Sequence, residues 1–242
     1  MTILNDLIAS LPEDTPVRSV LIGMHWTVVC SRHCGMSATL TSARLHGHMH
    51  LRDVDHLHRR SARELAELAH STELREASIG VAAINSMLDI DEALTVEINA
   101  SEVLASRGQG KNVALIGHFP FIQQLRQIAG QLWVIEQHPA EDEYPAESAV
   151  DLLPQADVIA ITGSTLVNHT LDELLALCNP HTTVMVLGPS TPLSPVLFNH
   201  GVTIISGTRV VDEPLVLRIV GQGASFRQVE GVKLLTLIRE KN

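Results

Sequence analysis

The sequence predicts an α/β fold in which a small α+β domain, residues 1–100, precedes a doubly wound domain with a mainly parallel sheet, residues 101–242. Three apolar runs predict the parallel sheet: residues 113–117, 158–162 and 184–187. Each run is short and apolar, as is typical of a strand buried on both faces. A polar turn containing glycine and a segment with helix-start residues follow each run, and this alternation of strands and helices indicates parallel pairing.

The composition indicates a compact protein. Of the 242 residues, 45% are hydrophobic and 18% are charged, whereas disordered chains are poorer in apolar groups and richer in charge. A formal net charge of −10 and an aromatic content of 3% disfavour nucleic acid as a partner, because its binding relies on clustered Lys and Arg and on stacking. The longest apolar stretch, residues 20–30, is too short to cross a bilayer, so we expect no membrane partner.

The cysteines and the N-terminal segment bear on the cellular compartment. Residues 1–10 contain Asp6 and no basic region of the kind that begins a secretory signal. Cys30, Cys34 and Cys178 are an odd number of cysteines, and in a chain without a leader we expect reduced thiols and a cytoplasmic location. An acidic protein of this size is also compatible with a homodimer.

The first part of the chain predicts one helix followed by a small sheet. Apolar residues spaced by three and four predict a helix over residues 2–11, which Pro12 ends. Residues 17–30 are β-rich, and Gly35 predicts a turn into a second strand that includes residues 38–40. The pattern is that of an α+β domain.

Two helices are predicted next. Ser61 and Glu64 have the spacing of a capping box, in which a hydroxyl and a carboxylate bind free amides at a helix N-terminus. The second helix has an apolar stripe made by Ala77, Val81, Ile84 and Leu88. A short helical stretch after Asn99 ends at residues 108–110, and we place the domain boundary in this region.

Helices and further strands are predicted between and after the three apolar runs. The helices span residues 120–129 and 171–178, and a third begins at Pro195. Thr170 and Glu173 predict a second capping box at the start of one of them. The additional strands span residues 132–136 and 202–206.

The turns after the parallel strands contain most of the candidate binding residues. Ligands collect at the carboxyl ends of the strands of an open parallel sheet, so we expect these turns to share one site. Glycine lets the backbone approach a ligand, and free amides, hydroxyls and side-chain amides supply hydrogen bonds. The same residue types also make turns and cap helices, which is the structural alternative. The candidates are Gly117, Phe119, Thr162, Gly163, Ser164, Thr165, Asn168, Gly188, Pro189, Ser190 and Thr191.

His118 is the candidate for proton transfer as a catalytic acid or base, or for metal ligation. It follows the first parallel strand, and the ordinary pKa of histidine lies near neutrality. A structural role is the alternative. Glu136 closes the second strand, where dinucleotide-binding folds place an acid that binds ribose.

The motifs of the common nucleotide and hydrolase sites are absent. No G-x-G-x-x-G precedes Glu136, so a standard NAD site is disfavoured. Residues 110–112 read Gly-Lys-Asn and precede a strand, unlike a phosphate loop. Residues 163–165 lack the second glycine of a nucleophile elbow.

Two further groups contain metal-binding residue types. Imidazole and carboxylate bind transition-metal ions, and they are concentrated in one polar segment at His46, His48, His50, Asp53, Asp55, His56 and His58. A solvated loop is the alternative for that segment, because it lacks the spacing of a structural zinc site. For Cys30, Cys34 and His33, the alternative to a metal clip is a strand end with two buried thiols.

Four ordered segments resemble a family of prokaryotic proteins named for putative heavy-metal chelation. They are residues 74–85, 116–121, 161–168 and 187–194, and the resemblance covers nearly the whole chain. It implies an enolase-like N-terminal domain joined to a Rossmann-like C-terminal domain, with the site in the cleft between them. The positions that match the family are Asn85, Gly117, His118, Phe119, Thr162, Gly163, Ser164, Thr165, Asn168, Gly188, Pro189, Ser190 and Thr191.

Two functions of different classes are compatible with these residues. The first is binding or handling of a heavy metal or a metal chelate in the interdomain cleft, with a transition-metal ion at His118. The second is an enzyme that acts on a small anionic metabolite, such as a metallophore precursor or a nucleotide-like compound, with His118 as acid or base. A module that senses a metabolite without converting it is a third alternative.

Overall fold

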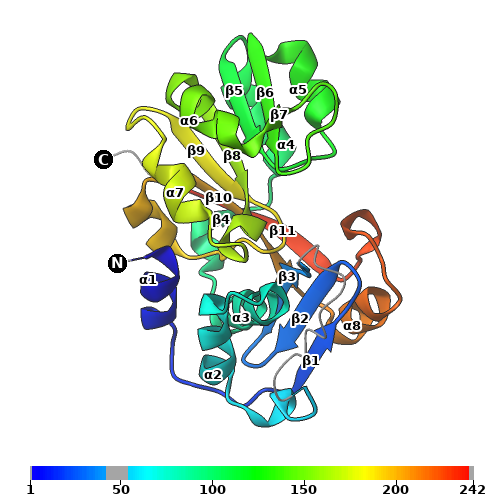
Figure 1. Cartoon of the computed structure of the whole chain (residues 1–242). Coiled ribbons are helices and arrows are strands. Elements are labelled where there is room, and N and C mark those ends of the chain that lie inside the picture. Colours follow the sequence, from blue (N-terminus) through cyan, green and yellow to red (C-terminus); the bar gives the residue numbers. More distant parts are fainter. Residues whose placement is uncertain (1, 42–53, 240–242) are drawn as a thin grey trace.

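The computed structural model of the protein describes residues 2–41 and 54–239 and contains two sheets (Figure 1). The smaller sheet has three strands in the order β1-β2-β3, and the larger has eight in the order β4-β11-β10-β9-β8-β5-β6-β7. Pairing is parallel from β10 through β9, β8, β5 and β6 to β7, and antiparallel where β11 joins β10 and β4. The predicted α/β class with a mainly parallel sheet is confirmed.

The smaller sheet packs against a helix that was predicted from the apolar stripe of residues 77–88. Its strands are β1 (Ser19–Ile22), β2 (Trp26–Cys30) and β3 (Cys34–Ala38), and the helices of this part are α1 (Ile3–Ala9), α2 (Ala62–Ala66) and α3 (Leu74–Met87). The capping box of α2 is confirmed: Ser61 Oγ accepts from the Glu64 amide at 3.2 Å, and Glu64 Oε2 accepts from the Ser61 amide at 2.8 Å. α3 buries its apolar stripe and contacts β2, β3 and α2.

The predicted turn at Gly35 is wrong. The turn lies at residues 31–33, and Gly35 lies within β3. A Cβ at Gly35 would lie 2.2 Å from the carbonyl oxygen of Ala82 and 2.3 Å from the amide nitrogen of Ser86, both in α3. Glycine is therefore required here because β3 and α3 approach each other closely, which a single-strand pattern does not reveal.

The larger sheet contains all the strands that the apolar runs predicted. Its strands are β4 (Thr95–Val96), β5 (Asn112–Ile116), β6 (Gln131–Glu136), β7 (Tyr144–Pro145), β8 (Val158–Thr162), β9 (Thr183–Leu187), β10 (Ile204–Val210) and β11 (Val232–Ile238). β5, β8 and β9 are buried along most of their length, in agreement with their continuous hydrophobicity. The sequence pattern did not predict β4, β7 and β11.

Helices cover both faces of the larger sheet. α4 (Ala100–Gly108) and α5 (Ile122–Ile128) share one apolar cluster with Val113 and Leu115 of β5. The intervening residues Ala114 and Ile116 join the cluster on the other face, where α6 (Ala149–Leu152) and α7 (Leu171–Ala176) pack. A strand whose successive residues enter two cores has to be apolar throughout, which explains the sequence of β5.

The capping box predicted for α7 is wrong, although the helix is present. The Thr170 side chain makes no capping hydrogen bond to a helix amide. Its hydroxyl lies 2.7 Å from Oδ1 of Asn168 and donates to it. Thr170 itself has helical dihedral angles, φ −96° and ψ −8°, whereas a residue whose side chain caps a helix is normally extended. Pro195 does occupy the first turn of the short 3₁₀ helix Pro195–His200, as predicted.

The C-terminal part of the chain returns to the smaller sheet. Figure 1 shows α8 (Glu213–Gly221) beside β1 and β2. Val216 and Val220 of α8 are buried in a cluster with Val28 and Met36 of the hairpin. The smaller sheet is thus enclosed between α3 and α8.

The structure corrects the predicted thiol state of two cysteines. Cys30 and Cys34 form a disulfide, whereas Cys178 is free. The two residues are directly paired across β2 and β3, and this cross-strand pairing brings their side chains together.

Within the described ranges, no helix has both the length and the apolar character that crossing a bilayer demands.

Candidate functional site

The three turns after β5, β8 and β9 contact one another. β8 lies between β5 and β9 and pairs with both in parallel, so all three strands end at one edge. A Cβ at Gly117, where φ is +110°, would lie 2.9 Å from Cγ2 of Thr162. A Cβ at Gly163 would lie 2.4 Å from Oγ1 of Thr191. The glycines thus allow adjacent turns to approach each other closely.

This edge is also the point where the order of the strands reverses. From β5 the chain continues to β6 and β7 on one side, then returns to β8 and β9 on the other side. Loops that leave in opposite directions open a crevice, which is where open α/β sheets bind ligands. His118 lies two residues after the end of β5, beyond Gly117, and therefore lies at this crevice.

Two cavities meet at His118 and Thr162, which line both. The larger has a volume of about 740 Å³, and the smaller of about 530 Å³. Of the predicted residues, the larger cavity also contacts Phe119, Gly188 and Pro189. The smaller is lined by Gly117, Glu136, Ser164, Thr165 and Asn168.

The larger cavity has aromatic walls from distant parts of the chain. Phe119 and Phe121 stack with ring centroids 5.3 Å apart, and Trp26 of β2 meets Phe226 edge-on at 5.4 Å. Two buried polar atoms of residues on this wall, Nε1 of Trp26 and Oγ1 of Thr208, have no hydrogen-bond partner among the described residues. Buried polar groups are normally paired, so these two atoms are exceptions, although both are enclosed by the protein and are not exposed to the cavity.

His118 is held by a carboxylate that the sequence did not single out. Nδ1 of His118 lies 3.0 Å from Oε1 of Glu143, and the other oxygen of Glu143 accepts the amide of Ala140 at 3.0 Å. The Glu143 side chain is 6% exposed, whereas that of His118 is 70% exposed. A fixed, buried carboxylate therefore orients an accessible imidazole.

The sequence gives no signal for the choice of Glu143. It lies in a run of acidic residues with Glu136, Glu141, Asp142 and Glu147, and such runs are usually solvated. Only the fold shows that this one carboxylate is buried beside His118, 25 residues away.

Asn85 and Ser190 join the smaller sheet to the site. Nδ2 of Asn85 donates to the carbonyls of Met36 at 2.9 Å and of Ser190 at 3.3 Å. Oγ of Ser190 accepts the amide of Ala38 at 2.8 Å. These groups fix β3 against the turn after β9, and neither residue lines the two larger cavities.

Several other predicted polar groups are used within the turns. Oγ1 of Thr165 donates to the carbonyl of Thr162 at 2.7 Å. The hydroxyls of Thr162 and Ser164 lie 3.0 Å apart. Oδ1 of Asn168 accepts from Thr170, and Oγ1 of Thr191 is buried without a partner in the described part of the chain. The polar groups of the predicted set therefore serve mainly to shape the rim.

The arrangement near His118 does not form a complete site for a bare metal ion. Across residues 2–41 and 54–239, the group of three His, Cys or acidic ligands close enough to share an ion is Cys30, Cys34 and Glu213. The predicted His46, His48, His50 and Asp53 lie outside the described residues. Within them, His56 pairs with its neighbour Asp55 at 3.0 Å, and His58 is exposed.

Comparison with known proteins identifies related sequences along most of the chain. Residues 99–238 match the family DUF364, and residues 4–88 match DUF4213; both carry the description "putative heavy-metal chelation". An uncharacterised protein of Methanocaldococcus jannaschii is 29% identical over 158 residues, which are 62% of this chain. The match spans 60% of the length of that relative.

Two crystal structures share the fold. A DUF364 protein of unknown function from Desulfitobacterium hafniense has a TM-score of 0.85 at 27% identity, covering 98% of each chain. A second DUF364 protein of unknown function, from Pyrococcus horikoshii, has a TM-score of 0.82 at 23% identity, covering 98% of this chain and 100% of its own. The latter similarity concerns the fold alone.

Proposed function

The chain belongs to the DUF364 family, described as putative heavy-metal chelation, and from this membership we propose that it binds a metal chelate at the ends of β5, β8 and β9. The ligand is an organic molecule that carries a metal ion with most of its coordination positions filled. It occupies the cleft between a domain of residues 1–100 and a domain of residues 101–242, and His118 supplies one further ligand.

The observation that carries this proposal is the His118–Glu143 pair, whose imidazole lines the cavity of about 740 Å³. Zinc sites in proteins have three or four protein ligands. One imidazole held by a carboxylate has the arrangement of a single metal ligand with its supporting partner. The pair therefore suits an ion that brings its other ligands with it.

The cavity supports an organic ligand of moderate size. Small-molecule sites commonly have volumes of about 300–1,000 Å³ and mainly apolar walls with few polar groups. The stacked rings of Phe119 and Phe121 offer a face on which a flat aromatic chelator can stack.

A redox-inert probe tests the proposal. The one-to-one complex of Zn²⁺ with terpyridine is flat and leaves coordination positions open, so we expect it to bind the untagged, disulfide-intact protein more tightly than terpyridine alone. His118→Ala should weaken binding of the complex while leaving binding of metal-free terpyridine unchanged. His181→Ala removes another exposed imidazole, near the other end of β9, and should have no effect.

Two outcomes of the titration oppose the proposal. One is equal affinity of the wild type and His118→Ala for the complex. The other is equal affinity of the protein for the complex and for metal-free terpyridine. Titration with free Zn²⁺ is a further control, because binding of the ion at sites elsewhere on the chain does not depend on His118.

The same pair favours a second candidate function, an enzyme that acts on a small anionic metabolite. An imidazole oriented by a carboxylate is suited to general acid–base catalysis, and Arg227 on the cavity wall supplies a positive charge. A metabolite screen by thermal shift tests this candidate, since a ligand at a hundredfold excess over its Kd stabilises the fold by about 2.7 kcal/mol. Turnover of a stabilising compound, lost in His118→Ala, would establish the enzyme; binding without turnover would count against it.

A further inference from the structure

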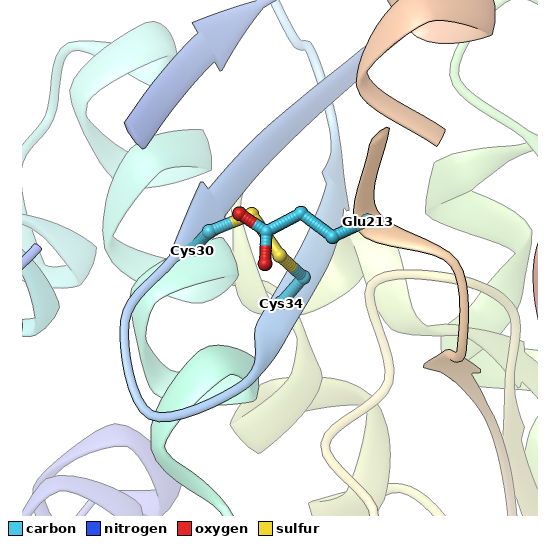
Figure 2. A group of neighbouring side chains, drawn as sticks. All are labelled: Cys30, Cys34 and Glu213. Carbon is cyan, nitrogen blue, oxygen red and sulfur yellow. A yellow bond between two sulfur atoms is a disulfide. The ribbon is translucent and has the colours of Figure 1, made fainter. Parts of the chain in front are cut away.

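We propose that Cys30, Cys34 and Glu213 form a second metal site, which takes a soft divalent ion only when the disulfide is reduced. The ligand atoms of the three residues lie within 4.8 Å of one another. Figure 2 shows the Glu213 carboxylate directed at the sulfur atoms from the neighbouring segment. The site does not depend on the His118 cleft or on the function proposed for it.

The two cysteines are held together by the backbone, independently of their bond. They are directly paired at the ends of β2 and β3, with Cα atoms 4.1 Å apart. The turn between them is fixed by a hydrogen bond from the Ser31 amide to the His33 carbonyl at 2.7 Å and by another from the His33 amide to Ser86 of α3 at 2.8 Å.

Side-chain contacts also fix the turn between Cys30 and Cys34. The hydroxyls of Ser31 and Ser86 lie 2.6 Å apart, and both residues are buried. Gly35 allows β3 to contact the backbone of α3. Reduction therefore leaves two thiols facing each other on a rigid hairpin, which is the preorganisation that a metal site requires.

Glu213 comes from the first turn of α8, on a different part of the chain. Val216 and Val220 of the same helix pack against the hairpin, so the carboxylate is brought to the sulfur atoms by a buried interface. Arg18 of the segment before β1 binds Glu213 at 2.6 Å. Its guanidinium orients the carboxylate as an outer partner orients a metal ligand.

The charges of this group match a divalent ion. Two thiolates and one carboxylate carry three negative charges, while Arg18 and a divalent ion carry three positive ones. The complete site is therefore neutral, which matters because Cys30 is fully buried and Cys34 is 8% exposed. Buried charge is tolerated when it is paired, and thiolate ligands select soft ions.

The chemistry balances with a dithiol as the reductant. Two electrons and two protons pass from the dithiol to the protein disulfide; the Cys30–Cys34 bond breaks, two thiols form, and the reductant closes its own disulfide. Binding of the ion then releases the two thiol protons to solvent. In the reverse direction the oxidised dithiol takes two electrons from the two thiolates and two protons from solvent; the Cys30–Cys34 bond forms again and the ion is released, so the pair acts as a redox-controlled release site.

Cd²⁺ titrations of oxidised and reduced protein test the site. Reduced protein is prepared with dithiothreitol, freed of it under anaerobic conditions and titrated while sulfur-to-metal charge-transfer absorption is recorded. We expect the absorption band and tight binding in reduced protein and neither in oxidised protein. Cys34→Ser should abolish the band, and Glu213→Gln should weaken binding by more than the roughly 10–100-fold that loss of an outer partner costs.

Matched controls separate this site from the rest of the chain. Glu97→Gln removes an exposed carboxylate that pairs with Lys233, Cys178→Ser removes the free thiol, and His118→Ala removes the cleft ligand; none should alter the Cd²⁺ band. If Cys34→Ser does not fold, protection of Cys30 and Cys34 from alkylation by Cd²⁺ in the reduced wild type gives the same information. Equal binding by oxidised and reduced protein, unchanged affinity in Glu213→Gln, or absence of protection would overturn the proposal.

Discussion

Replacing Gly163 by alanine should loosen the contact between two of the turns that form the site. The new Cβ would lie 2.4 Å from Oγ1, 2.6 Å from N and 2.9 Å from Cα of Thr191. Two of these neighbours are backbone atoms, which cannot rotate away, so the cost lies at the upper end of the 1–3 kcal/mol typical of overpacking, about 3 kcal/mol.

Alanine also restricts the unfolded chain, which offsets up to about 1 kcal/mol where its backbone conformation is allowed. Gly163 has no positive φ, so this gain applies. The expected net loss is about 2 kcal/mol in the free energy of unfolding, measured by urea denaturation at constant slope. The displaced turn should also weaken binding of the Zn²⁺–terpyridine complex.

Gly221→Ala is the matched control for this prediction. Its Cβ would meet only Cδ2 of Leu21, at 3.8 Å, an ordinary contact distance, and the residue ends α8. We expect no loss of stability there, because alanine is the better helix former. A Gly163→Ala protein as stable as Gly221→Ala would show that the turns are not packed as described.

Three further predictions concern stability and titration. Reduction of the Cys30–Cys34 bond, which spans a sequence separation of 4, should lower the free energy of unfolding by only about 2 kcal/mol, since the closed loop is short; global unfolding on reduction would contradict this. Burial raises the pKa of Cys178 to about 11, so its alkylation should be slow near neutral pH and accelerate toward that value; rapid alkylation of the folded protein at neutral pH would refute it. Hydrogen bonds from Arg32 and His33 lower the pKa of Asp89, so the stabilisation is present above the ordinary Asp pKa and lost as the pH falls through the lowered value. Asp89→Asn should therefore unfold more easily than the wild type at neutral pH, and the difference should vanish in strong acid.

The parallel strands were predictable because burial on both faces requires a continuous run of apolar residues, which is visible in the sequence. Successive residues of β5 enter cores on opposite faces, so the whole strand has to be apolar. β11 was not predicted because burial does not constrain its whole length: several of its residues are exposed, including Leu234 and Ile238. It pairs antiparallel with β10 and with the two-residue strand β4. β7 spans only two residues as well, too few for any periodicity.

The position of the site was predictable from the order of the elements, but its chemistry was not. Strand ends and glycines indicated where the turns would meet, whereas the roles of individual groups depend on tertiary contacts. Glu143 looks like any residue of an acidic loop until the fold buries it beside His118. Likewise, Glu213 and the cysteine pair are far apart in the sequence, and α8 alone brings them together.

A crystal structure of the oxidised, untagged protein with the Zn²⁺–terpyridine complex tests the central proposal most directly. Anomalous diffraction at the zinc edge locates the ion independently of the organic ligand. We predict zinc at about 2.0–2.1 Å from Nε2 of His118, with Glu143 still on Nδ1 and the rings of the chelator against Phe119 and Phe121. Zinc bound elsewhere, with neither His118 nor the aromatic wall in contact with the complex, would contradict it.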